Sequence, residues 1–133
     1  MNKTTQGFDN VLCIDDDDEY NFLTQEAFYD FEYSGQLKFM THAEDALDYL
    51  SNLPEFPDII ILDINMPIMN GWDFLNEFES RGYQKQHKTL IFLHSSSVFD
   101  SDKERAVRYS SVKGFIDKPL ELKDLEMISK DYF

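Results

Sequence analysis

A disulfide within this chain is excluded, because the chain contains only one cysteine, Cys13. A lone thiol fits a reducing compartment, so we expect a cytoplasmic protein. Long hydrophobic runs are also missing, and none approaches the roughly 20 residues that span a membrane. The first ten residues lack a basic region followed by an apolar stretch, so we expect neither a secretory signal nor membrane insertion.

Basic residues are scarce. Twelve Lys and Arg stand against 26 Asp and Glu, which gives a net charge of -14. Such a surface repels nucleic acid, because proteins bind nucleic acid largely by neutralising its phosphates with Lys and Arg. We therefore expect no direct contact with nucleic acid, whereas a basic protein partner is compatible with this charge.

The apolar residues that are present suffice for one core. The chain has 133 residues, 42% of them hydrophobic, with 12 Phe and 7 Tyr. A domain of this length folds without disulfides or structural metals. No internal repeat or linker divides the sequence, so we expect a single domain over 1–133, with a short N-terminal tail at about 1–8 and no output domain.

Short apolar runs alternate with segments of helical periodicity along the chain. The predicted strands are 11–14, 37–40, 58–62, 89–93 and 114–116, and the predicted helices are 19–31, 43–50, 72–80, 101–109 and 120–132. Runs that are apolar throughout are typical of strands buried on both faces. Five strand–helix alternations predict an α/β fold, in which helices cover both faces of a parallel sheet.

Polar side chains stand just past four of these strands. Asp15 and Asp16 follow the first strand and Asp63 the third, while Ser95 follows the fourth and Lys118 the fifth. Open parallel sheets bind ligands beyond the carboxyl ends of their strands. We therefore expect three carboxylates, a hydroxyl and an ammonium group to converge on one edge of the sheet.

This set of groups is suited to phosphoryl transfer. Clustered carboxylates repel one another unless a cation lies among them, and Mg²⁺ takes oxygen ligands and bridges to phosphate. An Asp carboxylate can also be a nucleophile that forms an acyl phosphate, and Asp63, alone at the central strand, is the candidate. Lys118 would offset charge on the phosphoryl oxygens, and Ser95 would donate a hydrogen bond to one of them.

Four stretches together resemble the receiver domain of bacterial two-component response regulators, the CheY-like family. The stretches are Ile14-Asp15-Asp16-Asp17, Ile60-Ile61-Leu62-Asp63-Ile64-Asn65-Met66-Pro67 with Asn70-Gly71, Leu93-His94-Ser95-Ser96, and Gly114-Phe115-Ile116-Asp117-Lys118-Pro119. They span nearly the whole chain in the family's order. The resemblance implies a flavodoxin-like/CheY-like five-stranded parallel sheet in the order 2-1-3-4-5, with five helices on both faces.

The resemblance also implies a metal site around the phosphoryl acceptor. Asp63 is implied to be the phospho-acceptor and a ligand of Mg²⁺, for which Mn²⁺ is a possible substitute. Asp16 is implied to bind the metal directly, Asp15 to act through water, and Asn65 to contribute its backbone carbonyl. All of these positions carry the residue type that the role requires.

A second group of residues is implied to bind and sense the phosphoryl group. Lys118 stands at the family's lysine, before a cis bond to Pro119, and Ser95 stands where the family has Thr or Ser. Phe115 occupies the aromatic position that repacks on activation. The surface expected to change lies around the fourth helix, fifth strand and fifth helix.

The function implied is that of a signalling switch in a phosphorelay. A sensor histidine kinase or a histidine phosphotransfer protein would pass its phosphoryl group to Asp63, which would alter binding to a downstream protein that the sequence does not identify. Such a domain is not an enzyme in the ordinary sense, because it catalyses only its own phosphoryl transfer and dephosphorylation.

Plainer interpretations of single residues stay open at this point. The acids from Asp15 to Glu19 could only begin a helix, or the metal-binding pair could be shifted by one residue. The same run imitates a Ca²⁺ loop, although Tyr20 stands where that loop needs Gly. Ser95 could serve a turn, and Phe115 could be a core residue.

His94 is unusual, because an apolar residue is more common before the family's Ser or Thr. It could tune the site by becoming charged at mildly acidic pH. Strand alternation, however, predicts that its side chain points away from Ser95.

Two other functions compete with the switch. One is a receiver-like interaction module that works without phosphorylation, although the acids and the lysine are all present. The other is an Asp-nucleophile phosphohydrolase, which commonly has a second acid two residues after the nucleophile, where this chain has Asn65.

Overall fold

The computed structural model describes residues 6–133, in which five parallel strands form one sheet in the order β2-β1-β3-β4-β5. The strands are β1 (Asn10–Ile14), β2 (Gln36–Met40), β3 (Ile59–Asp63), β4 (Leu90–Ser95) and β5 (Val112–Asp117). The predicted fold class and strand order are therefore confirmed. The predicted strands agree within two residues at each end.

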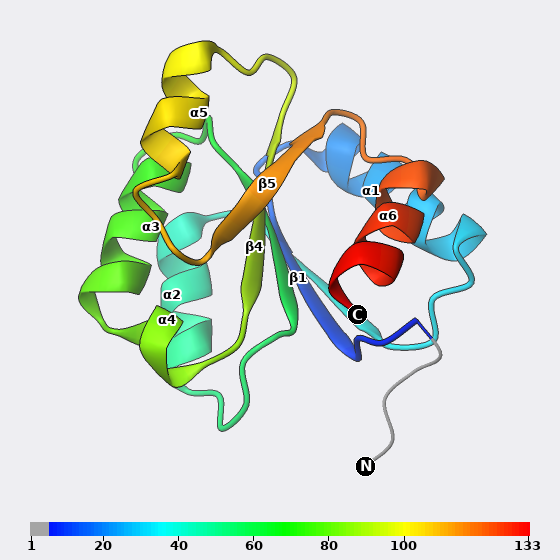
Figure 1. Cartoon of the computed structure of the whole chain (residues 1–133), viewed down its shortest axis with the longest axis horizontal. Helices are drawn as coiled ribbons and strands as arrows, with labels where there is room; N and C mark the ends of the chain where they lie inside the picture. The colour runs from blue at the N-terminus through cyan, green and yellow to red at the C-terminus, as the bar shows by residue number, and fades with distance from the viewer. Residues whose placement is uncertain (1–5) are drawn as a thin grey trace.

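Helices cover both faces of this sheet, α1 and α6 on one side and α2 to α5 on the other (Figure 1). Their bounds are α1 (Asp18–Asp30), α2 (Ala43–Ser51), α3 (Gly71–Ser80), α4 (Tyr83–Gln86), α5 (Asp100–Ala106) and α6 (Leu122–Tyr132). Within residues 6–133, no helix is both long and apolar enough to cross a membrane.

The predicted number of five helices is wrong by one. The additional helix, α4, is a single turn that starts after Gly82, whose φ of 74° ends the preceding helix. No residue of α4 is buried, so its sequence carries no apolar periodicity from which it could have been predicted.

Alternation along the strands builds two separate cores. Every residue of the central strand β3 is buried. Ile60 and Leu62 pack with α2 and α3, whereas Ile59 and Ile61 pack with α1 and α6. Because successive side chains of a strand point to opposite faces, a strand that is apolar throughout holds helices on both sides.

The described part of the N-terminal segment is packed against the C-terminal helix. Phe8 is fully buried and its ring lies 5.2 Å from that of Phe133. The Ser129 hydroxyl donates a hydrogen bond to the backbone carbonyl of Gln6 at 2.7 Å. Of the tail expected at about 1–8, residues 1–5 lie outside the described residues, and residues 6–8 contact the fold.

Candidate functional site: an acidic pocket at the carboxyl edge of the sheet

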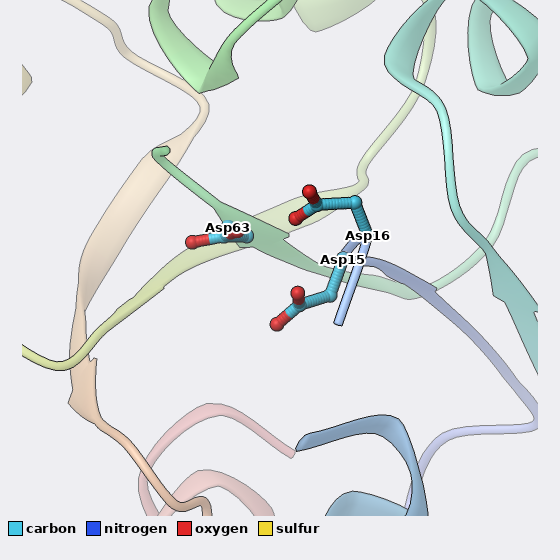
Figure 2. Close-up of side chains that lie close together, drawn as sticks. All are labelled: Asp15, Asp16 and Asp63. Atoms are coloured by element: carbon cyan, nitrogen blue, oxygen red, sulfur yellow. The ribbon is translucent and has the colours of Figure 1, made fainter. Parts of the chain in front are cut away.

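Three carboxylates meet at the carboxyl ends of two neighbouring strands. Asp15 and Asp16 follow β1, and Asp63 is the last residue of β3, which pairs with β1. One carboxylate oxygen of each lies within 4.8 Å of the others. Figure 2 shows the three side chains extending from these strand ends toward the same space. The structure thus brings together the three acids that the sequence singled out.

Backbone hydrogen bonds orient the two buried members of this group. Asp15 and Asp63 are each only 4% exposed, whereas Asp16 faces solvent. Oδ1 of Asp15 accepts from the backbone N–H of Asp17 at 2.9 Å, and Oδ1 of Asp63 accepts from that of Asn65 at 3.3 Å. Each buried carboxylate is therefore held by the loop that leads away from its own strand.

The carboxylate of Asp17, the next acid along the chain, caps a helix and does not approach Asp63. Asp17 is the N-cap of α1, and its side chain accepts hydrogen bonds from the backbone N–H groups of Glu19 and Tyr20 at 2.9 and 3.3 Å. The carboxylates that approach Asp63 are thus those of Asp15 and Asp16. Tyr20 and Glu26 lie inside a regular helix, so these residues do not form a Ca²⁺ loop.

Among residues 6–133, one ammonium group lies against the two buried carboxylates. The Nζ atom of Lys118 is 2.8 Å from Oδ2 of Asp15 and 3.2 Å from Oδ1 of Asp63. Its backbone N–H donates to the carbonyl of Ser95 at 3.0 Å, and a cis peptide bond joins it to Pro119. Lys118 therefore reaches the pocket from the end of β5, as its place after the predicted fifth strand required.

The charges in the pocket do not balance. Burial and the charge of Asp15 raise the pKa of Asp63 from 3.8 to about 6, although Lys118 opposes the shift. Burial alone would lower the pKa of Lys118, but its hydrogen bonds and ion pairs with Asp15 and Asp63 outweigh burial and raise it. Three carboxylates against one ammonium group leave negative charge that a divalent cation would neutralise, and the oxygen donors fit one.

Comparison with known proteins agrees with this geometry. Residues 11–129 match the model of the response regulator receiver domain family. The chain belongs to this family. A crystal structure of a two-component response regulator from Cytophaga hutchinsonii has a TM-score of 0.83 and 31% sequence identity, and the match covers 92% of this chain and 95% of that chain.

Sequence relatives include a regulator and a kinase. The protein named "Probable methanogenesis regulatory protein FilR2" of Methanothrix harundinacea is 27% identical over 122 residues, which are 87% of this chain and 76% of that protein. Sensor histidine kinase CheAY of Helicobacter pylori is 34% identical over 79 residues, which are 59% of this chain and 10% of that kinase. The chain is thus a receiver domain of two-component signalling.

Ser95 lies beside the acidic pocket of this receiver domain and does not line it. The side chain is 1% exposed, and its hydroxyl donates to the carbonyl of Ser97 at 2.9 Å. It borders a neighbouring cavity of about 140 Å³ together with Trp72 and Phe99. Ser96, to which the sequence analysis gave no role, lines the acidic pocket instead.

Phe115 is partly buried and packs against the core on the α2–α5 side of the sheet. This packing agrees with either interpretation of the residue, as a core aromatic or as one that repacks.

Gly71 allows the loop after Asp63 to fold back on the strand. A Cβ atom at this position would lie 2.6 Å from the backbone oxygen of Asp63 and 2.9 Å from Cα of Ile64. The backbone N–H of Gly71 also donates to the carbonyl of Ile64 at 2.9 Å. Only glycine permits this approach, which places the start of α3 directly behind the candidate acceptor.

His94 occupies the opposite face of β4, as alternation predicted. It is 2% exposed, and its Nε2 atom accepts a hydrogen bond from the backbone N–H of Leu120 at 3.1 Å. Burial, with a smaller effect of Lys118, lowers the pKa of His94 from 6.5 to about 3. The imidazole therefore remains neutral at mildly acidic pH, and the hypothesis that its charging tunes the site is wrong.

No role for Tyr20 was predicted from the sequence, yet its side chain lines the acidic pocket. The centre of its ring is 4.4 Å from Nζ of Lys118. The one signal in the sequence is its position four residues after Asp16, one turn along the helix that starts at the pocket. That spacing alone does not show which group the ring faces.

Proposed function

We propose that this receiver domain accepts a phosphoryl group on Asp63 and thereby changes its contacts with other proteins. The observation that carries the proposal is the meeting of Asp15, Asp16 and Asp63 with Lys118 at the ends of three strands. Residues 11–129 would act as one phosphorylatable unit. Its only catalytic activity would be its own phosphoryl transfer and dephosphorylation.

In the transfer, a carboxylate oxygen of Asp63 attacks the phosphorus of a phosphohistidine donor. A P–O bond forms as the P–N bond breaks, and its electron pair stays on the imidazole nitrogen, which takes up a proton. Lys118 lies 3.2 Å from Asp63, so its ammonium group is placed to stabilise the charge on the phosphoryl oxygens. Attack requires Asp63 to be ionised, which its raised pKa opposes and a nearby cation favours.

We expect the side chains of Asp16 and Asp63 and the backbone carbonyl of Asn65 to hold Mg²⁺, with Asp15 acting through water; Mn²⁺ is a possible substitute. When bound, such an ion supplies positive charge that neutralises the phosphoryl oxygens and the clustered carboxylates. The exposure of Asp16 leaves the pocket accessible from solvent.

The response to phosphorylation is proposed to run through Ser95 and Phe115. A phosphoryl group brings three strong acceptor oxygens and about −1.5 to −2 charges at neutral pH. The Ser95 hydroxyl would leave the Ser97 carbonyl for one of these oxygens and draw the loop before α5 toward the pocket. Phe115 would then repack, which alters the surface formed by α5, β5 and α6.

The proposed donor is a sensor histidine kinase or a histidine phosphotransfer protein, and the output is binding to a downstream protein. Support for the donor class comes from two relatives, one named as a sensor histidine kinase and one as a hybrid signal transduction histidine kinase. A cytoplasmic location and the absence of direct nucleic-acid contact remain predictions from the sequence.

The experiment is incubation with Mg²⁺ and acetyl phosphate, followed by intact mass spectrometry of the wild type and Asp63→Asn. We expect a labile gain of one phosphoryl group in the wild type, and no gain in the variant or in the presence of EDTA. A gain that persists in Asp63→Asn would place the acceptor elsewhere and contradict the proposal.

A protein that acetyl phosphate does not modify would next be given a phosphohistidine protein as donor. Transfer from this donor would support the proposal, and no transfer from either donor would favour an interaction module that works without phosphorylation. Repeated turnover of a small phosphate ester would favour the phosphohydrolase instead.

A further inference from the structure

The ammonium group of Lys118 has a third neighbour besides the two carboxylates, the ring of Tyr20. Its Nζ atom lies over this ring at 4.4 Å from the centroid, well inside the distance at which a cation is attracted to an aromatic face. The Lys118 side chain is only 6% exposed, so little water competes for the ammonium group. The ring therefore covers the only cation that contacts Asp63 among the described residues.

The ring of Tyr20 is itself held in place from the sheet. His94 meets it edge-on, with the ring centres 6.4 Å apart and an interplanar angle of 77°. The same imidazole accepts the backbone N–H of Leu120, two residues beyond Lys118, at 3.1 Å. His94 thus contacts both the ring that faces the ammonium group and the backbone that follows the lysine.

This arrangement differs from ordinary packing of a tyrosine on a helix surface. Tyr29 of the same helix is 79% exposed and turns to solvent, whereas Tyr20 turns inward and lines the acidic pocket. Lys118 reaches the carboxylates through a flexible four-carbon chain that ends in a compact ammonium group. A ring face on one side and two carboxylates on the other leave the ammonium group little freedom.

We propose that Tyr20 is a positioning residue of this receiver domain, whose ring face holds the Lys118 ammonium group against Asp63. Its effect on catalysis rests on the proposed function, because it acts through the lysine that stabilises the phosphoryl oxygens. The contact itself is independent of phosphorylation and can be measured without it.

The first readout follows the lysine directly in the unmodified protein. Protons above an aromatic face resonate upfield, so the ε-methylene signal of Lys118 should lie upfield of the other lysines in ¹H–¹³C spectra. The signal is assigned by its loss in Lys118→Arg. We expect it to stay upfield in Tyr20→Phe, to move to the ordinary lysine position in Tyr20→Leu, and to stay unchanged in the control Tyr29→Leu.

The second readout is the rate of phosphoryl uptake from acetyl phosphate, with the maximal rate and the half-saturating donor concentration measured separately. Tyr20→Leu should lower the maximal rate roughly 2- to 30-fold, the range for loss of one cation–π contact. The half-saturating concentration should change much less, and Tyr20→Phe should recover most of the rate.

The two readouts separate the two proposals. An ordinary Lys118 signal in the wild type, or equal signals and rates in Tyr20→Leu and the wild type, would overturn the role of Tyr20. A Lys118 signal that depends on the ring in a protein that no donor phosphorylates would support the positioning contact, while the proposed function would fail.

Discussion

The backbone N–H of Leu120 donates a hydrogen bond to Nε2 of His94 across 3.1 Å, in a buried part of the interface between the sheet and α6. This bond ties the segment after Lys118 to the neighbouring strand. The backbone bond from Lys118 to Ser95 does the same two residues earlier. The loop that carries the lysine is therefore fastened to β4 at two points.

Replacing His94 by Leu should destabilise the fold at neutral pH by about 1–3 kcal/mol, because the buried N–H of Leu120 loses its acceptor. The difference should shrink as the pH falls. In the wild type the pKa of His94 is about 3 in the folded protein and 6.5 in the unfolded chain. As the pH falls below 6.5, the unfolded chain therefore takes up a proton before the folded protein does, and the free energy of unfolding decreases. This slope reaches about 1.4 kcal/mol per pH unit, and His94→Leu lacks it.

Urea unfolding at pH 7 and pH 5 measures this difference. His42→Leu, in which the replaced side chain is 49% exposed, serves as the control. A gap between the wild type and His94→Leu that is equally large at both pH values would contradict the assignment of His94 as a buried neutral acceptor.

Asp63→Asn should stabilise the metal-free protein at pH 7. The pKa of Asp63 is about 6 in the folded protein and 3.8 in the unfolded chain, so the folded protein binds the proton more tightly. This preference stabilises the fold fully below pH 3.8 and is lost as the pH rises through 6. At pH 7 the ionised Asp63 therefore opposes folding, by an amount on the order of 3 kcal/mol at most. The neutral amide removes this penalty.

The measurement is urea unfolding in EDTA at pH 7 and pH 4, with the exposed Glu26→Gln as the control. The stabilisation should be present at pH 7 and small at pH 4. A variant that is no more stable than the wild type at pH 7 would show that repulsion among the carboxylates is already relieved without a metal.

Mg²⁺ should raise the thermal stability of the wild type, because an ion that binds only the folded state stabilises it by mass action. At ten times the dissociation constant the gain is about 1.4 kcal/mol. Asp16→Asn should lose most of this gain. Asp17→Asn should keep it, since Asn caps a helix as well as Asp does. If thermal melts instead show that Asp17→Asn loses the gain and Asp16→Asn keeps it, the metal-binding pair is Asp16 and Asp17.

Ser95→Ala should still accept a phosphoryl group on Asp63 but fail to transmit it. Trp72 borders the same cavity as Ser95, so its fluorescence should change on phosphorylation in the wild type. We expect that change in Ser95→Thr, which keeps the hydroxyl, and not in Ser95→Ala. If the fluorescence of Ser95→Ala changes on phosphorylation as much as that of the wild type, the Ser95 hydroxyl does not transmit phosphorylation.

Gly71→Ala should destabilise the fold by about 1–3 kcal/mol, because its Cβ would lie 2.6 Å from the backbone oxygen of Asp63. Gly114→Ala is the matched control, since a Cβ there would meet its nearest neighbour, a ring atom of Phe92, at 3.9 Å. Thermal unfolding of both variants tests the contrast. Equal melting temperatures would show that the loop behind Asp63 moves without penalty.

Much of the fold could be predicted because its signals are local. Strands such as Ile59–Asp63 are apolar throughout, and their alternation with amphipathic helices predicts a parallel sheet with two covered faces. The single turn of α4 was not predicted because it has only four residues and none of them is fully buried. The ends of helices were predicted less well: the helix expected over 101–109 is α5, which ends at Ala106. Beyond it, the backbone N–H groups of Arg108 and Tyr109 donate to carbonyls three residues back, in a turn, and not four residues back as in an α-helix.

The sequence by itself determined that Asp15, Asp16 and Lys118 meet Asp63, because the carboxyl ends of parallel strands share one edge of the sheet. It also determined the direction in which His94 points, through the period of two along a strand. The tertiary structure decided which groups touch: Tyr20 covers Lys118, Ser95 binds Ser97, and Ser96 lines the pocket. The contact between Tyr20 and Lys118 joins side chains that are 98 residues apart, and the other two depend on the path of the loop after β4. These distances follow from how the helices and loops pack on the sheet, and the spacing of residues along the chain does not specify them.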